Sequence, residues 1–132
     1  LAAAGIPFDS TFVEEGDLTR GGGYQAAQRL LGLPHPPTAI IGANDLTAIG
    51  VLHAAHERGL VVGRDLAVAG YDGIEDSEHT QPPLTTLKQP TYETVSKLVN
   101  MLIACIADAS LENPQQTILP ELIVRESTGG RF

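Results

Sequence analysis

The chain contains one cysteine and few basic residues, and each shortage excludes a class of structure or of function. The single cysteine, Cys105, excludes an intramolecular disulfide and a metal site built from several cysteines. Cys105 lies among apolar residues at helical spacing, so we expect a thiol packed in a hydrophobic core. The lack of disulfides is in keeping with a reducing, cytoplasmic compartment.

Positive charge is also scarce. Eight Lys and Arg residues against sixteen Asp and Glu residues give a formal net charge of −8 at pH 7. Surfaces that bind nucleic acid need clustered basic residues, whereas the basic residues here are scattered singly along the sequence. We therefore expect no DNA binding by these residues themselves. We also expect no membrane partner, because no apolar run approaches the roughly 20 residues that a membrane helix needs.

The length of 132 residues is enough for one domain with a hydrophobic core. The chain starts with Leu1 rather than Met, and residues 1–7 read as the last turn of a helix that Gly5 ends. We therefore expect a fragment of a larger domain, cut within an element.

Short apolar segments alternate with amphipathic segments that have helical spacing. We expect strands at residues 11–14, 38–42, 66–71, 84–89 and 119–126, the second of them buried on both faces. Helices should follow the capping residues Thr19, Asn44 and Thr91. The glycines at 21–23 lack the features of a phosphate loop and should allow close packing of another backbone. This alternation predicts an α/β fold with an open, doubly wound parallel sheet.

Two of the predicted strands are followed by polar side chains where ligands bind in open α/β sheets. Asn44 can cap a helix, with Asp45 complementing the helix dipole, or it can offer a donor and an acceptor to a ligand hydroxyl. Asp72 is either a solvated turn residue or an acceptor for two vicinal hydroxyls. The residues leave both alternatives open.

Other candidate chemistry is weaker. His53 and His56 have a spacing compatible with a metal ion, but the sequence nearby supplies no further ligands. The acidic residues at 75, 76 and 78 do not match a calcium loop. No nucleophile motif is visible, and an enzyme that used Asp72 as a base would need a second catalytic group. We predict no catalytic residues, no metal and no cofactor.

An ordered series of motifs resembles the effector-binding core of the lactose/galactose-repressor family of bacterial transcription regulators. The series comprises Glu15-Gly16-Asp17-Leu18-Thr19, Pro37-Thr38-Ala39 through Asn44-Asp45, Gly59 through Asp72, Pro83-Leu84-Thr85-Thr86-Leu87-Lys88-Gln89-Pro90 and Leu122 through Ser127. The resemblance covers nearly the whole chain.

The resemblance implies a periplasmic-binding-protein-like type I core, with the effector between two lobes. Residues 1–85 and 117–132 would form most of the C-terminal lobe, 91–110 a helix of the N-terminal lobe, and 86–90 and 111–116 the crossings. It also implies that four residues contact the effector, namely Asn44, Asp72, Gln89 and Leu18, the last at a position where several relatives have an aromatic ring.

The resemblance further implies a homodimer, a carbohydrate-like effector and operator binding through a helix-turn-helix outside this sequence. The implied dimer face comprises Gly22, Tyr24, Thr47, Val51, Ala54, Ser77 and Gln81. The expected function is the effector-binding and dimerisation part of a cytoplasmic transcriptional repressor that the effector controls allosterically. The alternative is a transport-type periplasmic sugar-binding protein of the same fold, which an upstream signal peptide would favour.

Overall fold

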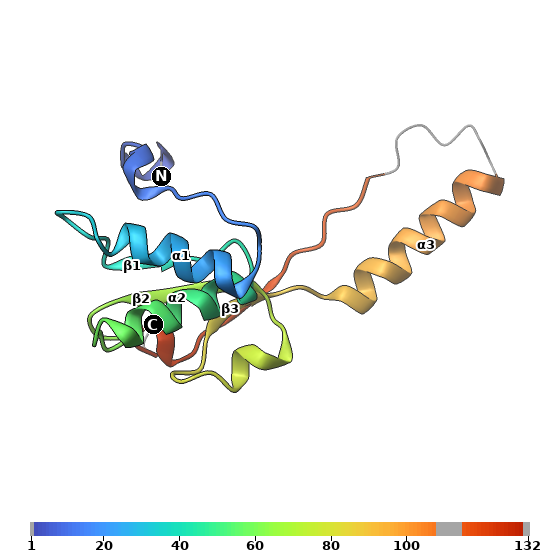
Figure 1. Cartoon of the computed structure of the whole chain (residues 1–132). Coiled ribbons are helices and arrows are strands. Elements are labelled where there is room, and N and C mark those ends of the chain that lie inside the picture. Colours follow the sequence, from blue (N-terminus) through green and yellow to red (C-terminus); the bar gives the residue numbers. More distant parts are fainter. Residues whose placement is uncertain (1, 108–114, 131–132) are drawn as a thin grey trace.

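A four-stranded open sheet forms the centre of the molecule. The computed structural model describes residues 2–107 and 115–130 (Figure 1). The strands are β1 (Ala39–Ile41), β2 (Ala67–Asp72), β3 (Thr85–Lys88) and β4 (Glu121–Ile123), arranged in the order β1-β2-β3-β4. β1, β2 and β3 are parallel neighbours, whereas β4 pairs antiparallel with β3. The open α/β sheet is confirmed, but β4 makes it a mixed sheet rather than an all-parallel one.

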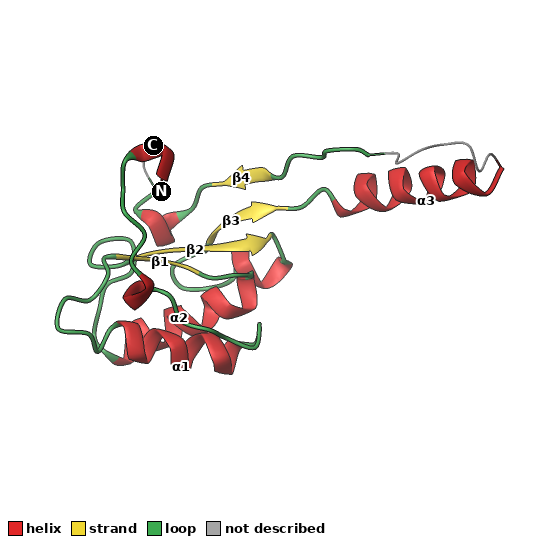
Figure 2. Cartoon of the chain, turned by 90° about the horizontal axis from the view of Figure 1, so that it is seen from above, coloured by secondary structure: helices red, strands yellow, loops and turns green. Residues whose placement is uncertain are grey.

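Two helices pack together on one face of this sheet (Figure 2). They are α1 (Arg20–Leu30) and α2 (Asp45–Glu57). Their backbones lie very close, because a Cβ atom at Gly23 would lie 2.2 Å from the Thr47 carbonyl oxygen. The close packing expected for the glycines at 21–23 is therefore confirmed at Gly23. The buried core combines side chains of α1, α2 and the strands: Ala27, Leu30, Leu31, Ile40, Ala48, Ile49, Val51, Leu52, Ala54, Ala55, Leu66, Val68 and Leu84.

The predicted caps of the first two helices are confirmed. Thr19 Oγ1 accepts a hydrogen bond from the Gly22 N–H at 3.0 Å, and Asn44 Oδ1 accepts one from the Thr47 N–H at 2.8 Å. The third helix, α3 (Thr91–Ala107), instead begins at Thr91 itself, and the Thr94 N–H donates to the Pro90 carbonyl. The prediction of Thr91 as the cap was therefore wrong by one residue, because the carbonyl of Pro90 accepts the first hydrogen bond of the helix. Proline suits this position, since it has no N–H that needs a partner.

α3 extends away from the sheet, as Figures 1 and 2 both show. None of its residues is buried, and its apolar face is open, at Val95, Leu98, Val99, Leu102, Ile103 and Ile106. Cys105 is only partly buried on this helix. The expectation of a core thiol was therefore wrong for the described residues, because α3 has no core to pack against. Residues 108–110 of the predicted helix and most of the crossing at 111–116 lie outside the described residues.

The predicted strand at residues 11–14 is absent. The structure places the 3₁₀ helix η2 (Ser10–Phe12) there, after η1 (Ala2–Ala4). Among the described residues β1 has a paired neighbour on one side only, and its Ile41 is 80% exposed. The expectation that residues 38–42 are buried on both faces was therefore wrong. A strand requires a hydrogen-bonded neighbour, and among the described residues the segment before α1 does not pair with β1.

The remaining strands lie where the sequence placed them, although the last is shorter. β4 covers three residues of the predicted 119–126 and is followed by η4 (Glu126–Thr128). Between β2 and β3 lies η3 (Glu75–Glu78). Among residues 2–107 and 115–130, no helix combines the length and the apolar character needed to cross a bilayer.

Candidate ligand-binding site

Three predicted ligand residues lie at the carboxyl ends of three adjacent parallel strands. Asn44 follows β1, Asp72 is the last residue of β2, and Gln89 directly follows β3. Because β1, β2 and β3 run parallel, these ends meet at one edge of the sheet. This edge is the usual ligand-binding position in open α/β folds.

Asp72 and Gln89 are in direct contact. The Gln89 Nε2 group donates to Asp72 Oδ1 at 2.8 Å, and the Gln89 backbone N–H donates to the Asp72 carbonyl at 3.1 Å. Both residues line an open hollow of about 860 Å³ between the end of β2 and the start of α3. Lys88 and Tyr92 also line it, and neither was among the predicted ligand residues. Their position beside Gln89 was the one signal that could have indicated them.

The backbone at Asp72 is held in an unusual conformation. Its φ angle is 116°, a region that favours glycine and costs an aspartate on the order of 1–3 kcal/mol. The next residue, Gly73, also has a positive φ, and a Cβ atom there would lie 2.6 Å from Lys88 Cβ. The turn after β2 therefore passes directly beside the segment that carries Gln89. Such strain is common where a protein fixes the position of a functional side chain.

Asn44 serves as a structural tether. Its Oδ1 accepts hydrogen bonds from the Thr47 N–H and hydroxyl at 2.8 and 2.7 Å, and its Nδ2 donates to the Leu18 carbonyl at 3.0 Å. Leu18 has a φ of 63°, and its side chain lines a second hollow, of about 510 Å³, beside β1. The structure therefore brings the four candidates together as two pairs, Asp72 with Gln89 and Asn44 with Leu18.

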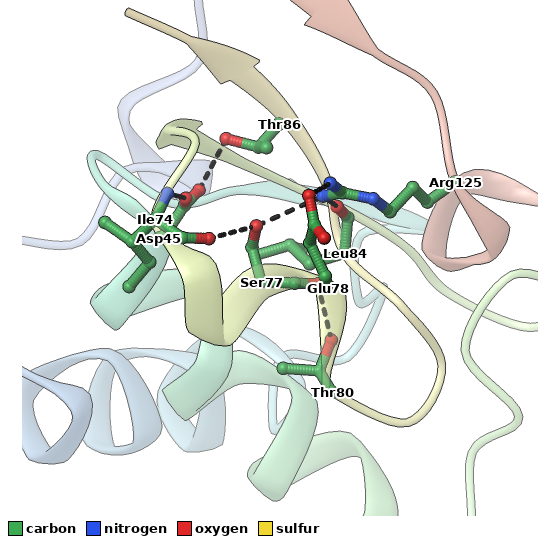
Figure 3. A network of polar contacts seen from close by, with 8 residues as sticks. All are labelled: Asp45, Ile74, Ser77, Glu78, Thr80, Leu84, Thr86 and Arg125. Atoms are coloured by element: carbon green, nitrogen blue, oxygen red, sulfur yellow. Dashed lines mark hydrogen bonds and ion pairs between the residues drawn. The ribbon is translucent and has the colours of Figure 1, made fainter. Parts of the chain in front are cut away.

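A buried polar network lies beneath this edge of the sheet (Figure 3). Asp45 is fully buried, and its carboxylate accepts hydrogen bonds from the Thr86 hydroxyl at 2.6 Å and the Ile74 N–H at 2.9 Å. Asp45 does lie in the first turn of α2, as expected for a residue that complements the helix dipole. Its burial and its partners were not predicted, because they come from residues 29 and 41 positions away.

The same network continues to the end of the chain. The Arg125 guanidinium donates to the Leu84 carbonyl at 2.7 Å, to Ser77 Oγ at 3.1 Å and to Glu78 at 2.8 Å (Figure 3). Arg125 thereby fixes η3 to the start of β3. Arg125 lies in the family motif of residues 122–127, but no role was predicted for its side chain.

The residues of the implied dimer face differ in accessibility. Gly22, Tyr24 and Thr47 are half-buried and Gln81 is exposed. The other three, Val51, Ala54 and Ser77, are almost completely buried within this chain. They can therefore hold the exposed residues of such a face in place but cannot contact a second copy directly. The Tyr24 hydroxyl donates to Glu57 at 2.5 Å, and this hydrogen bond raises the pKa of Tyr24.

A hollow of about 580 Å³ lies on the same side of the molecule. It is lined by His53 and His56 of α2 and by His79 after η3, together with the ion pair of Arg20 and Asp76. Among the described residues, no three His, Cys, Asp or Glu side chains are arranged so that they could hold a metal ion.

Comparisons with known proteins agree with this architecture. The family described as "Periplasmic binding protein-like domain" matches residues 1–128. The HTH-type transcriptional repressor CytR of Escherichia coli K12 is 37% identical over 128 residues, which cover 97% of this chain and 38% of the repressor. The chain thus spans less than two-fifths of the length of this curated relative.

Solved structures give the same result. A protein of Sanguibacter keddieii described as a LacI-family transcriptional regulator superposes with a TM-score of 0.89 at 35% identity, over 98% of this chain and 50% of that one. The transcriptional regulator CelR, solved as a cellobiose complex, superposes with a TM-score of 0.85 at 35% identity, over 96% of this chain and 38% of that one. The chain therefore belongs to the periplasmic-binding-protein-like family, with the effector-binding regions of the LacI-type (lactose/galactose-repressor) transcriptional regulators as its relatives.

Proposed function

We propose that this chain is the effector-binding and dimerisation part of a transcriptional repressor that senses a small carbohydrate-like molecule. The observation that carries the proposal is the contact of Asp72 with Gln89 at the mouth of an open hollow, at the carboxyl ends of β2 and β3. A carboxylate and an amide can together accept from and donate to vicinal hydroxyls. The cellobiose complex of CelR supports a saccharide as the class of ligand.

The rest of the proposal follows the relatives. A helix-turn-helix outside these 132 residues would bind operator DNA, because the basic residues here are scattered and the curated relative is an HTH-type repressor. The protein would act in the cytoplasm and would be no enzyme. α3 would belong to a second lobe, reached through residues 86–90 and 111–116, and the effector would bind between the lobes. Asn44 and Leu18 would form the far side of the site.

The first experiment is a thermal-shift screen of the protein with its complete two-lobed core, using cellobiose, other saccharides, sugar phosphates and nucleobases. A ligand at a hundred times its Kd stabilises the folded state by about 2.7 kcal/mol, which raises the melting temperature by several degrees. The key variant is Asp72→Gly, because glycine accommodates the positive φ at this position while the carboxylate is lost. We expect the saccharide shift to disappear in this variant.

The matched control is Asp65→Ala. Asp65 precedes β2, so it lies toward the amino end of the strand that Asp72 ends. This variant should keep the saccharide shift. A shift that survives Asp72→Gly would show that the site lies elsewhere, and a shift with nucleobases alone would replace the proposed ligand class.

A further inference from the structure

A buried carboxylate connects the segments that carry the candidate ligand residues. Asp45 and Thr86 are 0% and 1% exposed, and the Thr86 hydroxyl and the Ile74 N–H are the hydrogen-bond donors to Asp45 among the described residues. A carboxyl group out of water is costly unless hydrogen-bond donors such as these satisfy its oxygen atoms. The carboxylate is therefore held by one donor from β3 and one from the turn after β2 (Figure 3).

A glycine in the sheet leaves room for the Asp45 carboxylate. Gly70 of β2 is the register partner of Thr86 of β3. A Cβ atom at Gly70 would lie 2.2 Å from Asp45 Oδ1, so any larger residue would displace the carboxylate. Asp45 thus lies over the β2–β3 pair, and its position depends on both strands.

Each of the three connected groups is close in sequence to a candidate ligand residue. Asp45 follows Asn44 directly, Ile74 comes two residues after Asp72, and Thr86 comes three residues before Gln89. On its other side, Ile74 precedes η3, where its carbonyl accepts hydrogen bonds from the Ser77 hydroxyl at 2.6 Å and N–H at 3.0 Å. A shift of β3 that moved Thr86 would therefore reach η3 through Asp45 and Ile74.

We propose that Asp45 is a positioning residue that couples the crossing strand β3 to the turn at 72–74 and to η3. The inference rests on the proposed function, because the Asp45 carboxylate would connect the proposed ligand site with the loop of the implied dimer face. The physical basis is that a buried carboxylate with two donors cannot lose one without leaving a polar group unpaired. Movement at one donor is thus transmitted to the other.

The test is amide hydrogen exchange of the full chain, followed by NMR, which needs no ligand. Thr86→Val keeps the shape of the side chain but removes its hydroxyl. We expect the protection of the Ile74 amide to fall about tenfold, relative to the amide of Gly42, which directly follows β1 and donates to the Ala69 carbonyl. The Gln89 amide, which donates to the Asp72 carbonyl, should lose protection with it. Thr86→Ser keeps the hydroxyl and should restore both.

Two further variants separate coupling from general loosening. Thr85→Val removes the neighbouring hydroxyl, which contacts Arg125 and Thr128 instead of Asp45, and it should leave the ratio of Ile74 to Gly42 protection unchanged. Asp45→Ala removes the acceptor of both hydrogen bonds, so it should lower Ile74 protection at least as far as Thr86→Val does.

An unchanged Ile74 to Gly42 ratio in Thr86→Val and Asp45→Ala would overturn the proposal. So would a loss of Ile74 protection with no change at Gln89, because the carboxylate would then be a local support only. Neither outcome depends on saccharide binding, so a failure here is distinct from a failure of the proposed function.

Discussion

Several small polar side chains each serve two segments. Asn44 caps α2 and holds the Leu18 carbonyl, while Ser127 Oγ donates to the Val68 carbonyl at 2.6 Å and accepts from the Thr85 N–H at 2.8 Å. Asp17 stabilises the start of α1, because it accepts from the hydroxyl of the capping residue Thr19 at 2.6 Å and from its N–H at 3.0 Å. Substitution of such a residue therefore changes local structure as well as any ligand contact.

The Asp17 carboxyl gives a prediction on pH dependence. The Thr19 hydroxyl, followed by the Thr19 N–H, lowers the pKa of Asp17 below its ordinary value. The stabilisation from this group is therefore complete above the unfolded pKa of about 3.9 and is lost as the pH falls through the lower, folded pKa. In Thr19→Val we expect the pKa of Asp17 to rise toward its ordinary value, measured by NMR titration of the carboxyl carbon.

The chain supplies its own control for this titration. Asp9 accepts from the hydroxyl and N–H of Thr11 in the same way, and these hydrogen bonds also lower its pKa. Thr19→Val should leave the pKa of Asp9 unchanged, and Thr19→Ser should leave that of Asp17 low. An Asp17 pKa that did not respond to Thr19→Val would contradict the assignment of the hydroxyl as the main cause.

At the scale of elements, the helices differ in what they pack against. α2 buries eight of its residues between α1 and the sheet, whereas α3 buries none. We therefore expect the two helices to contribute very differently to the free energy of unfolding. Most helical stability in proteins comes from packing of the apolar face rather than from helix propensity.

Matched leucine substitutions test this difference. Leu84→Ala, at a side chain with 0% exposure, should lower the free energy of unfolding by about 2–5 kcal/mol. Leu102→Ala on α3, where the side chain is 59% exposed, should change it by less than about 0.5 kcal/mol. Urea denaturation followed by circular dichroism measures both. A large effect of Leu102→Ala would show that α3 is packed in solution, against another copy or another part of the protein.

At the scale of the whole molecule, apolar side chains are open to solvent in several places among the described residues, and two of these places bear on association. One is the α3 face, and the other is the hollow beside β1, where Phe12, Val13 and Ile41 are 45%, 56% and 80% exposed. The implied dimer face near α2 and η3 is a third, more polar region, with Gln81 exposed on it. Each offers a different way for two copies to associate.

Light scattering distinguishes these surfaces. We expect a dimer at high micromolar concentration through the α2–η3 face, since self-complementary contacts are the usual basis of homodimers. Gln81→Arg should weaken it at least about tenfold, because a two-fold contact brings like charges together. Leu98→Glu on α3 should leave the mass unchanged. A monomeric mass for the unsubstituted chain would contradict the dimer, and a dimer that only Leu98→Glu disrupts would place the contact on α3.

The sequence by itself determined the local features. The sequence predicted the strands β1, β2 and β3, the caps Thr19 and Asn44, and the position of Asp72 at the end of a strand. These features could be predicted because caps and short apolar strands depend on neighbouring residues. The ordered motifs also indicated the family, which the comparison over residues 1–128 then showed. Of the candidate site, the residue types and their strand ends were predictable, but their contacts were not.

The tertiary structure alone decided which side chains meet. The contact of Gln89 with Asp72 joins residues 17 positions apart, and those of Asp45 and Arg125 join residues 29 to 48 apart. It also decided that β4 is antiparallel, that residues 11–14 form no strand and that the apolar face of α3 is uncovered. Strand pairing, side-chain burial and ion pairs depend on which segments the folded chain brings together. A local sequence pattern shows only which side chains a segment could bury, and not whether another segment lies there to cover them.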